Sequence, residues 1–382
     1  MRILALKLEN WKNFREVDAR LQQRVFVVGP NASGKSNFLD SFRFLQDLAS
    51  DGGGLQAAVR NRDGVSKIRC LAARRYPDVG IGISLGDELS DPEWHYRIKF
   101  HQDNLRRPLV REEVVCRWGK EVLCRPDAED RKDPERLTQS HLEQVTSNKD
   151  FRDIAEFLQS VRYLHVVPQL IRHPDRFDVK RTQARDPFGS DFLDQIARTP
   201  EKTLRSRLRR INAALAIAVP QLQELDLQRD ELGVPHLQGR YEHWRAKGAW
   251  QSEGQFSDGT LRLMGLLWSV LDGTGPLLLE EPELSLHTSV VRHIPQMLAR
   301  VTRRSRRQIV VSTHSTELLE DTGIAMDEVL LLQPDPNGTQ VSLMSDHKEI
   351  MALVEAGESI SETAIPLTAP KKAHQLSMFG DS

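Results

Sequence analysis

The sequence is poor in cysteine and lacks long apolar runs. Its 382 residues include only Cys70, Cys116 and Cys124, an odd number without a Cys-x-x-Cys pair. We therefore expect reduced thiols rather than a disulfide framework or a zinc site. No stretch approaches the roughly 18–20 apolar residues of a membrane span. The opening residues, interrupted by Lys7, carry no cleavage site. We expect no signal peptide, no membrane partner and a cytoplasmic protein.

An excess of charge of one sign is also absent. Lys and Arg number 53 and Asp and Glu 54, so the net charge is −1. Bulk charge therefore does not indicate a nucleic-acid partner, and any such surface must be a local patch. Two arginine-rich stretches are candidates for a DNA path, and a solvated helix face is the competing interpretation of the first. They comprise Arg205, Arg207, Arg209 and Arg210, and Arg303, Arg304, Arg306 and Arg307. A sustained heptad pattern is missing, so any arm is short.

What the sequence does contain is a phosphate-binding loop. Residues 29–36 fit G-x-x-x-x-G-K-[ST], between the β-branched run 24–28 and a helical pattern from Asn37 to Leu48. Such a loop lets backbone N–H groups and a helix N-terminus face phosphates. Lys35 should reach the β- and γ-phosphates, and the Ser36 hydroxyl should bind Mg²⁺. The predicted nucleotide-binding residues of the loop are Gly29, Pro30, Asn31, Ala32, Ser33, Gly34, Lys35, Ser36 and Asn37.

Three further segments carry chemistry. The hydrophobic strand 276–279 ends in Glu280 and Glu281. Strand alternation points these carboxylates in different directions, so one can hold Mg²⁺ while the other polarises the attacking water. A small polar turn, Ser-Asp-Gly-Thr at 257–260, opens a helix before this strand, and a strand after it delivers His314 among hydroxyls.

The patterns along the chain predict an α/β fold with an antiparallel β subdomain. Alternating segments at 2–8, 68–72, 79–85, 94–100 and 113–118 indicate strands, the later ones a meander. Residues 125–150 are polar and charged and indicate a surface insertion or a flexible arm.

The second half of the chain predicts helices and then α/β structure again. Residues 151–250 show helical spacing at both ends, and 261–271 is an apolar helix. The tail from Pro366 is polar and predicted to be disordered. Strands are expected at 276–279, 308–311 and 329–332. The predicted parts are residues 1–120 (lobe I), 121–250 (a charged, mainly helical insert), 251–345 (lobe II) and 346–382 (a C-terminal tail).

In this order, the loop, the Ser-Asp-Gly-Thr turn, the acidic strand and the histidine resemble the ABC-type P-loop ATPase head. The closest likeness is the RecF/SMC/OLD branch of AAA-family ATPases, which act in DNA maintenance and phage defence. Three segments are similar to that branch: Leu-Glu-Asn-Trp-Lys-Asn-Phe at 8–14, the loop containing Asn31, and Leu-Leu-Leu-Glu-Glu-Pro-Glu-Leu-Ser-Leu-His at 277–287. The resemblance covers roughly residues 1–110 and 250–335.

The resemblance implies ATP hydrolysis with Mg²⁺ by a homodimer whose two heads sandwich two ATP molecules. The phosphate loop of one copy would face the signature residues of the other, where a helix N-terminus offers N–H dipoles to the γ-phosphate. These signature residues are Ser257, Asp258, Gly259 and Thr260. By this resemblance, Glu281 is the general base, and Glu280 is the carboxylate on the metal side, where relatives often have Asp. His314 is the switch that senses the γ-phosphate, and Lys35 is also a catalytic residue.

Other matches to the family are local. The segment from Glu283 to His287 corresponds to the loop that joins the two sites. Lys12 and Asn13 correspond to the turn that borders the base. Gln46 and Gln56 are candidates for the glutamine that senses Mg²⁺.

Residues Gln375 to Phe379 resemble the bacterial sliding-clamp-binding pentapeptide. Exposed Leu, Met and Phe side chains in a polar tail suit docking in a partner groove, and packing on the chain's own domain is an equal alternative.

We therefore expect an ATP-gated dimer in DNA repair or maintenance, or in anti-phage defence. Since no second active site is visible in the sequence, a separate effector such as a nuclease or TOPRIM-type companion would follow by analogy. The alternatives are an ATPase subunit of a transporter-like complex and a scaffold that binds ATP without turnover.

Overall fold

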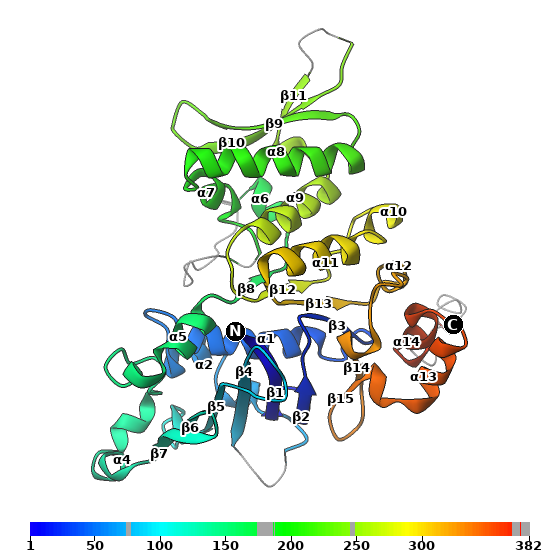
Figure 1. Ribbon diagram of the computed structural model, residues 1–382. Coiled ribbons are helices and arrows are strands. Elements are labelled where there is room, and N and C mark those ends of the chain that lie inside the picture. Colours follow the sequence, from blue (N-terminus) through cyan, green and yellow to red (C-terminus); the bar gives the residue numbers. More distant parts are fainter. Residues whose placement is uncertain (74–77, 174–185, 187, 245–248, 369–374, 376–382) are drawn as a thin grey trace.

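The computed structural model describes residues 1–73, 78–173, 186, 188–244, 249–368 and 375, which form three sheets and the helices around them (Figure 1). The strands are β1 (Arg2–Trp11), β2 (Phe14–Arg20), β3 (Arg24–Val28), β4 (Val79–Gly86), β5 (Trp94–Gln102), β6 (Pro108–Arg117), β7 (Lys120–Arg125), β8 (Arg162–Leu164), β9 (Leu222–Arg229), β10 (Pro235–Tyr241), β11 (Ala249–Ser252), β12 (Leu277–Glu280), β13 (Ile309–Thr313), β14 (Val329–Gln333) and β15 (Gln340–Leu343).

The α-helices are α1 (Lys35–Ala49), α2 (Leu55–Arg60), α3 (Val65–Ile68), α4 (Ala128–Lys132), α5 (Arg152–Gln159), α6 (Pro168–Arg172), α7 (Phe192–Ala197), α8 (Glu201–Ala218), α9 (Asp258–Leu271), α10 (Thr288–Val291), α11 (Ile294–Ser305), α12 (Thr316–Leu319), α13 (Lys348–Glu355) and α14 (Ile360–Thr368). Short 3₁₀ helices are η1 (Pro134–Thr138), η2 (Lys149–Phe151), η4 (Glu253–Gln255), η5 (Met326–Glu328) and η6 (Met344–Asp346). None of the helices described here is long and apolar enough to cross a membrane.

A six-stranded, mostly parallel sheet forms the centre of the molecule. Its order is β15-β14-β3-β13-β12-β8, and only β15 runs antiparallel. Because successive strand residues point to opposite faces, each central strand supplies two hydrophobic cores. One core joins α1 to Val25, Val27, Leu278, Val310 and Leu330. The other joins α9 and α11 to Phe26, Val28, Leu279, Val311 and Leu331. Figure 1 shows α1 on one side of this sheet and α9 and α11 on the other.

The antiparallel subdomain is confirmed. The sheet β2-β1-β4-β5-β6-β7 contains the predicted first strand and a meander from β4 to β7. The predicted strand at 68–72 is wrong. Residues 65–68 form the helix α3, and only Arg69 bridges to Trp11. Five alternating residues are too few to separate a strand from a helical turn, and Gly64, with φ of 98°, starts the turn here.

Of the two alternatives for 125–150, a surface insertion or a flexible arm, the flexible arm is wrong, because charged residues of this segment have buried ion-pair partners. The buried Arg125 guanidinium pairs with Glu113 at 3.0 Å and with Asp130 at 2.9 Å. Glu113 in turn accepts hydrogen bonds from the backbone N–H groups of His141 and Leu142. The segment therefore folds over the meander around a buried ion pair network, which a count of polar residues cannot reveal.

The middle of the chain is less helical than expected. Helices α5 and α8 confirm the predicted helical ends, but β8 joins the central sheet, and β9, β10 and β11 form a separate antiparallel sheet beside α8. Near the C-terminus, α13 and α14 are ordered, and α14 continues through Pro366 to Thr368, so the predicted disorder does not begin at Pro366. The proposed part boundaries at 120, 250 and 345 stay a prediction.

Replacing Arg125 by Met should lower the free energy of unfolding by about 3–5 kcal/mol, because Glu113 and Asp130 are left buried and uncompensated. Urea denaturation followed by circular dichroism measures this. Arg205→Met removes an exposed ion pair to Glu201 and should cost about 1 kcal/mol or less. Equal costs for the two variants would contradict the assigned role of Arg125.

Candidate functional site

The phosphate loop joins the end of β3 to the start of α1. Its backbone turns through left-handed conformations at Ala32 (φ 64°) and Gly34 (φ 98°). No side chain caps the first turn of α1, which leaves its N-terminal N–H groups for an anion. A Cβ on Gly34 would lie 2.1 Å from the Asn13 amide nitrogen, so only glycine fits there. The loop has the form of a phosphate cradle.

The Lys35 ammonium group lies at the centre of this loop. It donates hydrogen bonds to the carbonyl oxygens of Gly29 (2.9 Å) and Pro30 (3.3 Å) and lies 3.9 Å from a carboxylate oxygen of Glu281. Burial lowers the pKa of Lys35, while the neighbouring carboxylates of Glu281, Glu283 and Glu280 act in the opposite direction. A cation is therefore held beside the cradle.

Glu280, the last residue of β12, is bound on both carboxylate oxygens. One accepts a hydrogen bond from the Ser36 hydroxyl at 2.5 Å, and the other accepts one from the Tyr163 hydroxyl. A hydroxyl and a carboxylate in contact are the oxygen donors that Mg²⁺ prefers, so Ser36 and Glu280 fit the metal of an ATP–Mg²⁺ site.

Tyr163 was missed by the sequence analysis. It lies on β8, beside β12, and the Arg43 guanidinium stacks 4.3 Å from its ring centroid. Burial, together with the charge of Glu280, raises the pKa of Tyr163 far above its usual value, which keeps the hydroxyl protonated. The short β-branched and aromatic run at 161–167 is the signal that could have revealed this strand.

Glu281 points away from Glu280, toward the neighbouring strand. Its carboxylate lies 3.0 Å from Nδ1 of His314, which follows β13. The backbone at Glu281 is left-handed (φ 44°), and its N–H donates to the Ser312 carbonyl. The two carboxylates therefore diverge as expected, but Glu281 follows β12 in a left-handed turn, so strand alternation alone does not set their directions.

The segment after Glu281 is buried at Glu283. This carboxylate accepts a hydrogen bond from the Thr313 hydroxyl at 2.6 Å, and burial raises the pKa of Glu283. His287, at the end of the segment, accepts a hydrogen bond from the Ser289 N–H and caps α10.

The Ser-Asp-Gly-Thr turn forms the N-terminus of α9. The Ser257 hydroxyl caps it by accepting from the Thr260 N–H at 3.1 Å, and Asp258 pairs with Arg172 at 2.6 Å. A Cβ on Gly259 would lie 2.5 Å from the Ser285 carbonyl oxygen, so the turn packs closely on the 283–287 segment. Ser257 itself is exposed. Helices α9 and α1 pack on opposite faces of the central sheet. The turn and the phosphate loop, which precede these helices, therefore belong to opposite faces of that sheet.

Lys12 and Asn13 hold the loop from behind. The Asn13 carboxamide donates to the Ser33 carbonyl and the Thr339 hydroxyl, both at 2.8 Å, and accepts from the Asn37 amide at 2.8 Å. Lys12 pairs with Asp40 of α1 at 2.8 Å. Burial alone would raise the pKa of Asp40, but Arg62 and Lys12 lower it to about 2. These contacts hold the phosphate loop in place, and the predicted position of Lys12 and Asn13 beside the nucleobase stays a prediction.

Neither glutamine candidate for Mg²⁺ sensing reaches the site. The Gln46 amide donates to the Val161 carbonyl at 2.7 Å. The Gln56 amide donates to the carbonyls of Pro108 and Thr138. Both side chains are used to join backbone segments. Of the pentapeptide from Gln375 to Phe379, all residues after Gln375 lie outside the described residues.

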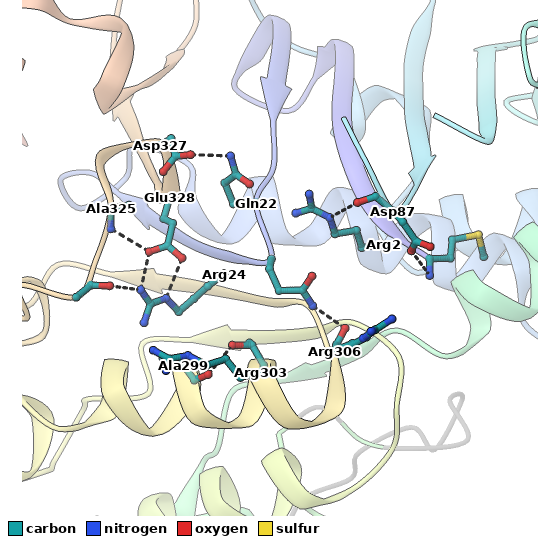
Figure 2. A pocket seen from close by; sticks show the side chains of 14 residues that line it. Arg2, Gln22, Arg24, Asp87, Ala299, Arg303, Arg306, Ala325, Asp327 and Glu328 are labelled. Carbon is teal, nitrogen blue, oxygen red and sulfur yellow. Dashed lines mark hydrogen bonds and ion pairs between the residues drawn. The ribbon is translucent and has the colours of Figure 1, made fainter. Parts of the chain in front are cut away.

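A cavity of about 800 Å³ lies at the other end of β3, away from the phosphate loop (Figure 2). Arg24 pairs there with Glu328 at 2.6 Å, and the Gln22 amide donates to Asp327 at 2.8 Å. Arg303 and Arg306 also line the cavity. Arg307 is fully buried instead and donates to the Gly275 and Ser269 carbonyls, so it does not belong to a DNA-facing surface.

Comparison with known proteins places this site in a family. Residues 24–320 match the protein family described as "AAA domain, putative AbiEii toxin, Type IV TA system". The chain belongs to this AAA family. No curated protein matches the sequence.

Solved structures show the fold of this AAA protein. An SMC head bound to the C-winged helix domain of ScpA matches with a TM-score of 0.53 and 14% identity, over 90% of this chain and 97% of that chain. An SMC head with an extended coiled coil from Pyrococcus furiosus, bound to the C-terminal domain of ScpA, matches with a TM-score of 0.50 and 13% identity, over 93% and 99%. The AAA protein therefore has the α/β fold of an SMC head, which agrees with the predicted ABC-type head fold.

The position of Asn13 gives a prediction for nucleotide selectivity. Asn13→Ala should weaken the affinity for ATP and for GTP alike, by about tenfold, because a misplaced loop affects the phosphates common to both. Equilibrium binding of fluorescent ATP and GTP analogues measures this. A change in the ratio of the two affinities would instead assign Asn13 to the base. Lys67→Ala, an exposed change on α3, is the control.

Proposed function

We propose that this AAA protein hydrolyses ATP with Mg²⁺ as one half of a head-to-head dimer. The observation that carries the proposal is that the two carboxylates at the end of β12 have different partners. Glu280 contacts Ser36, whereas Glu281 lies between His314 and Lys35. Two carboxylates with different partners at one phosphate loop suit metal binding and water activation.

Each residue then has a role that its contacts support. The loop N–H groups and Lys35 bind the β- and γ-phosphates, and Ser36 with Glu280 would hold Mg²⁺. Bound Mg²⁺ supplies positive charge to the phosphate oxygens. Glu281 accepts the proton of the attacking water, and His314 holds the Glu281 carboxylate and reaches the γ-phosphate.

The position of the signature turn supports the proposed dimer. Ser257 is exposed at the N-terminus of the 14-residue helix α9, on the side of the sheet opposite α1. A second copy can bring its Ser257 and Gly259 against the nucleotide, where the helix N-terminus stabilises the γ-phosphate. ATP binding then closes the dimer and hydrolysis opens it.

Glu281→Gln should retain ATP binding and lose turnover by about 10²–10⁴-fold, because the amide cannot accept the water proton. Phosphate release measures the rate, and light scattering with ATP should show a trapped dimer. Ser257→Arg in the Glu281→Gln background should bind ATP and stay monomeric. Turnover at the wild-type rate by Glu281→Gln would contradict the assignment of Glu281 as the general base. Dimerisation of the variant that also carries Ser257→Arg would contradict the ATP sandwich.

We further propose that the dimer acts on DNA, in repair or in anti-phage defence, and gates a separate effector such as a nuclease or TOPRIM-type protein. The family description, which names a toxin of a toxin–antitoxin system, supports defence. The solved SMC heads bind ScpA domains, which supports a protein partner for this head as well. A sliding clamp contacted through residues 375–379 is a further candidate partner.

The DNA proposal has a local surface to test. Arg303 and Arg304, at the C-terminal end of α11, are exposed, and no ion pair holds either of them among the described residues. In the α8 stretch, by contrast, Arg205 pairs with Glu201 and Arg207 pairs with Asp272.

Arg303→Glu combined with Arg304→Glu should weaken duplex DNA binding and reduce the salt slope by about 2, since each phosphate contact contributes about 0.9. Fluorescence anisotropy over a range of NaCl concentrations measures both. Arg60→Glu with Lys67→Glu, two exposed cations on α2 and α3 outside both arginine-rich stretches, is the control with the same change of charge. An unchanged slope in the α11 variant would dismiss this surface.

A further inference from the structure

The Glu280 carboxylate needs external partners to hold one orientation. A glutamate side chain has more rotatable bonds than an aspartate, and its terminal torsion is broad. Here both oxygens are fixed, one by Ser36 and the other by Tyr163. Glu280 is only partly buried, so packing alone does not restrict it.

The two donors are not equivalent. Under the function proposed above, on which this inference rests, the Ser36 oxygen is itself a metal ligand. Its direct hydrogen bond to Glu280 would be given up when both groups hold the metal, so Ser36 would orient the carboxylate only in the metal-free state. The Tyr163 hydroxyl has no such second task and remains the fixed donor to Glu280.

Tyr163 is itself held rigidly. Its strand β8 pairs in parallel with β12, with Tyr163 opposite Leu278, two residues before Glu280. Arg43 of α1 covers the ring at 4.3 Å from the centroid. The hydroxyl is therefore placed by the sheet on one side and by the phosphate-loop helix on the other.

We propose that Tyr163 is a positioning residue that orients the Glu280 carboxylate toward Mg²⁺ at the nucleotide site. The arrangement does not involve Gln46 or Gln56, whose amides donate to the backbone carbonyls of Val161 and Pro108. It also explains how a glutamate serves where a shorter aspartate would need less support. Outer partners of metal ligands contribute about 10–100-fold to metal affinity.

The test uses isothermal titration calorimetry to measure how the full chain binds a non-hydrolysable ATP analogue at increasing Mg²⁺ concentrations. Tyr163→Phe keeps the ring under Arg43 and removes only the hydroxyl. The Mg²⁺ concentration for half-maximal binding should rise about 10–100-fold. Tyr241→Phe is the matched control and should change nothing, because Tyr241 lies on β10, in a different sheet from Tyr163 and Glu280.

A double-mutant cycle separates positioning from packing. In the Glu280→Asp background the shorter carboxylate is out of reach of the hydroxyl, so Tyr163→Phe should add no further loss. An equal loss in both backgrounds, or a lower melting temperature with unchanged Mg²⁺ dependence, would overturn the proposal. Binding is measured without turnover, so the two proposals can fail separately. If the variants shift the Mg²⁺ dependence as expected but the wild-type chain does not hydrolyse ATP, only the proposed function is refuted.

Discussion

The parallel alignment of β3, β13 and β12 is the constraint on which the site depends. Their hydrogen bonds place Val28, Thr313 and Glu280 near one edge of the sheet, with Thr313 opposite Val28 and Ser312 opposite Glu280. Everything that could contact a triphosphate then leaves the sheet at that edge. Residues far apart in the chain meet because buried parallel strands must end together, with helices on both faces.

The edge also concentrates polar groups that the interior tolerates poorly. Glu283 and Lys35 are buried charges, and one oxygen of Glu283 and the hydroxyls of Ser33 and Ser312 have no hydrogen-bond partner in the described part of the chain. Such groups cost stability unless they are paired. Their presence beside a left-handed Glu281 indicates a site maintained for chemistry rather than for folding.

The sequence predicted those parts of the site whose chemistry is local. The phosphate loop, the paired carboxylates and the strand-end histidine each fit within a few residues, and the structure brings them together. Tyr163 could not be predicted, because its role arises from pairing between β8 and β12 across more than a hundred residues. The same limit applies to Gln46, whose amide donates to the Val161 carbonyl, 115 residues further along the chain. Arg125 is a different case: Glu113 and Asp130 are only 12 and 5 residues away, but a count of charged residues does not tell which of them pair in the interior.

In the dimer proposed above, strand alternation accounts for the way in which each chain supplies half of a site. Val27 and Val28 are neighbours in β3, yet one belongs to the core under α1 and the other to the core under α9. The phosphate loop and the signature turn are therefore built on opposite faces of the same strands, and shifting one strand by a residue would exchange its two cores. In the proposed dimer, a rotated second copy would bring its signature turn to the phosphate loop of the first. This placement of the two elements on opposite faces is why we propose association of two heads rather than closure within one chain.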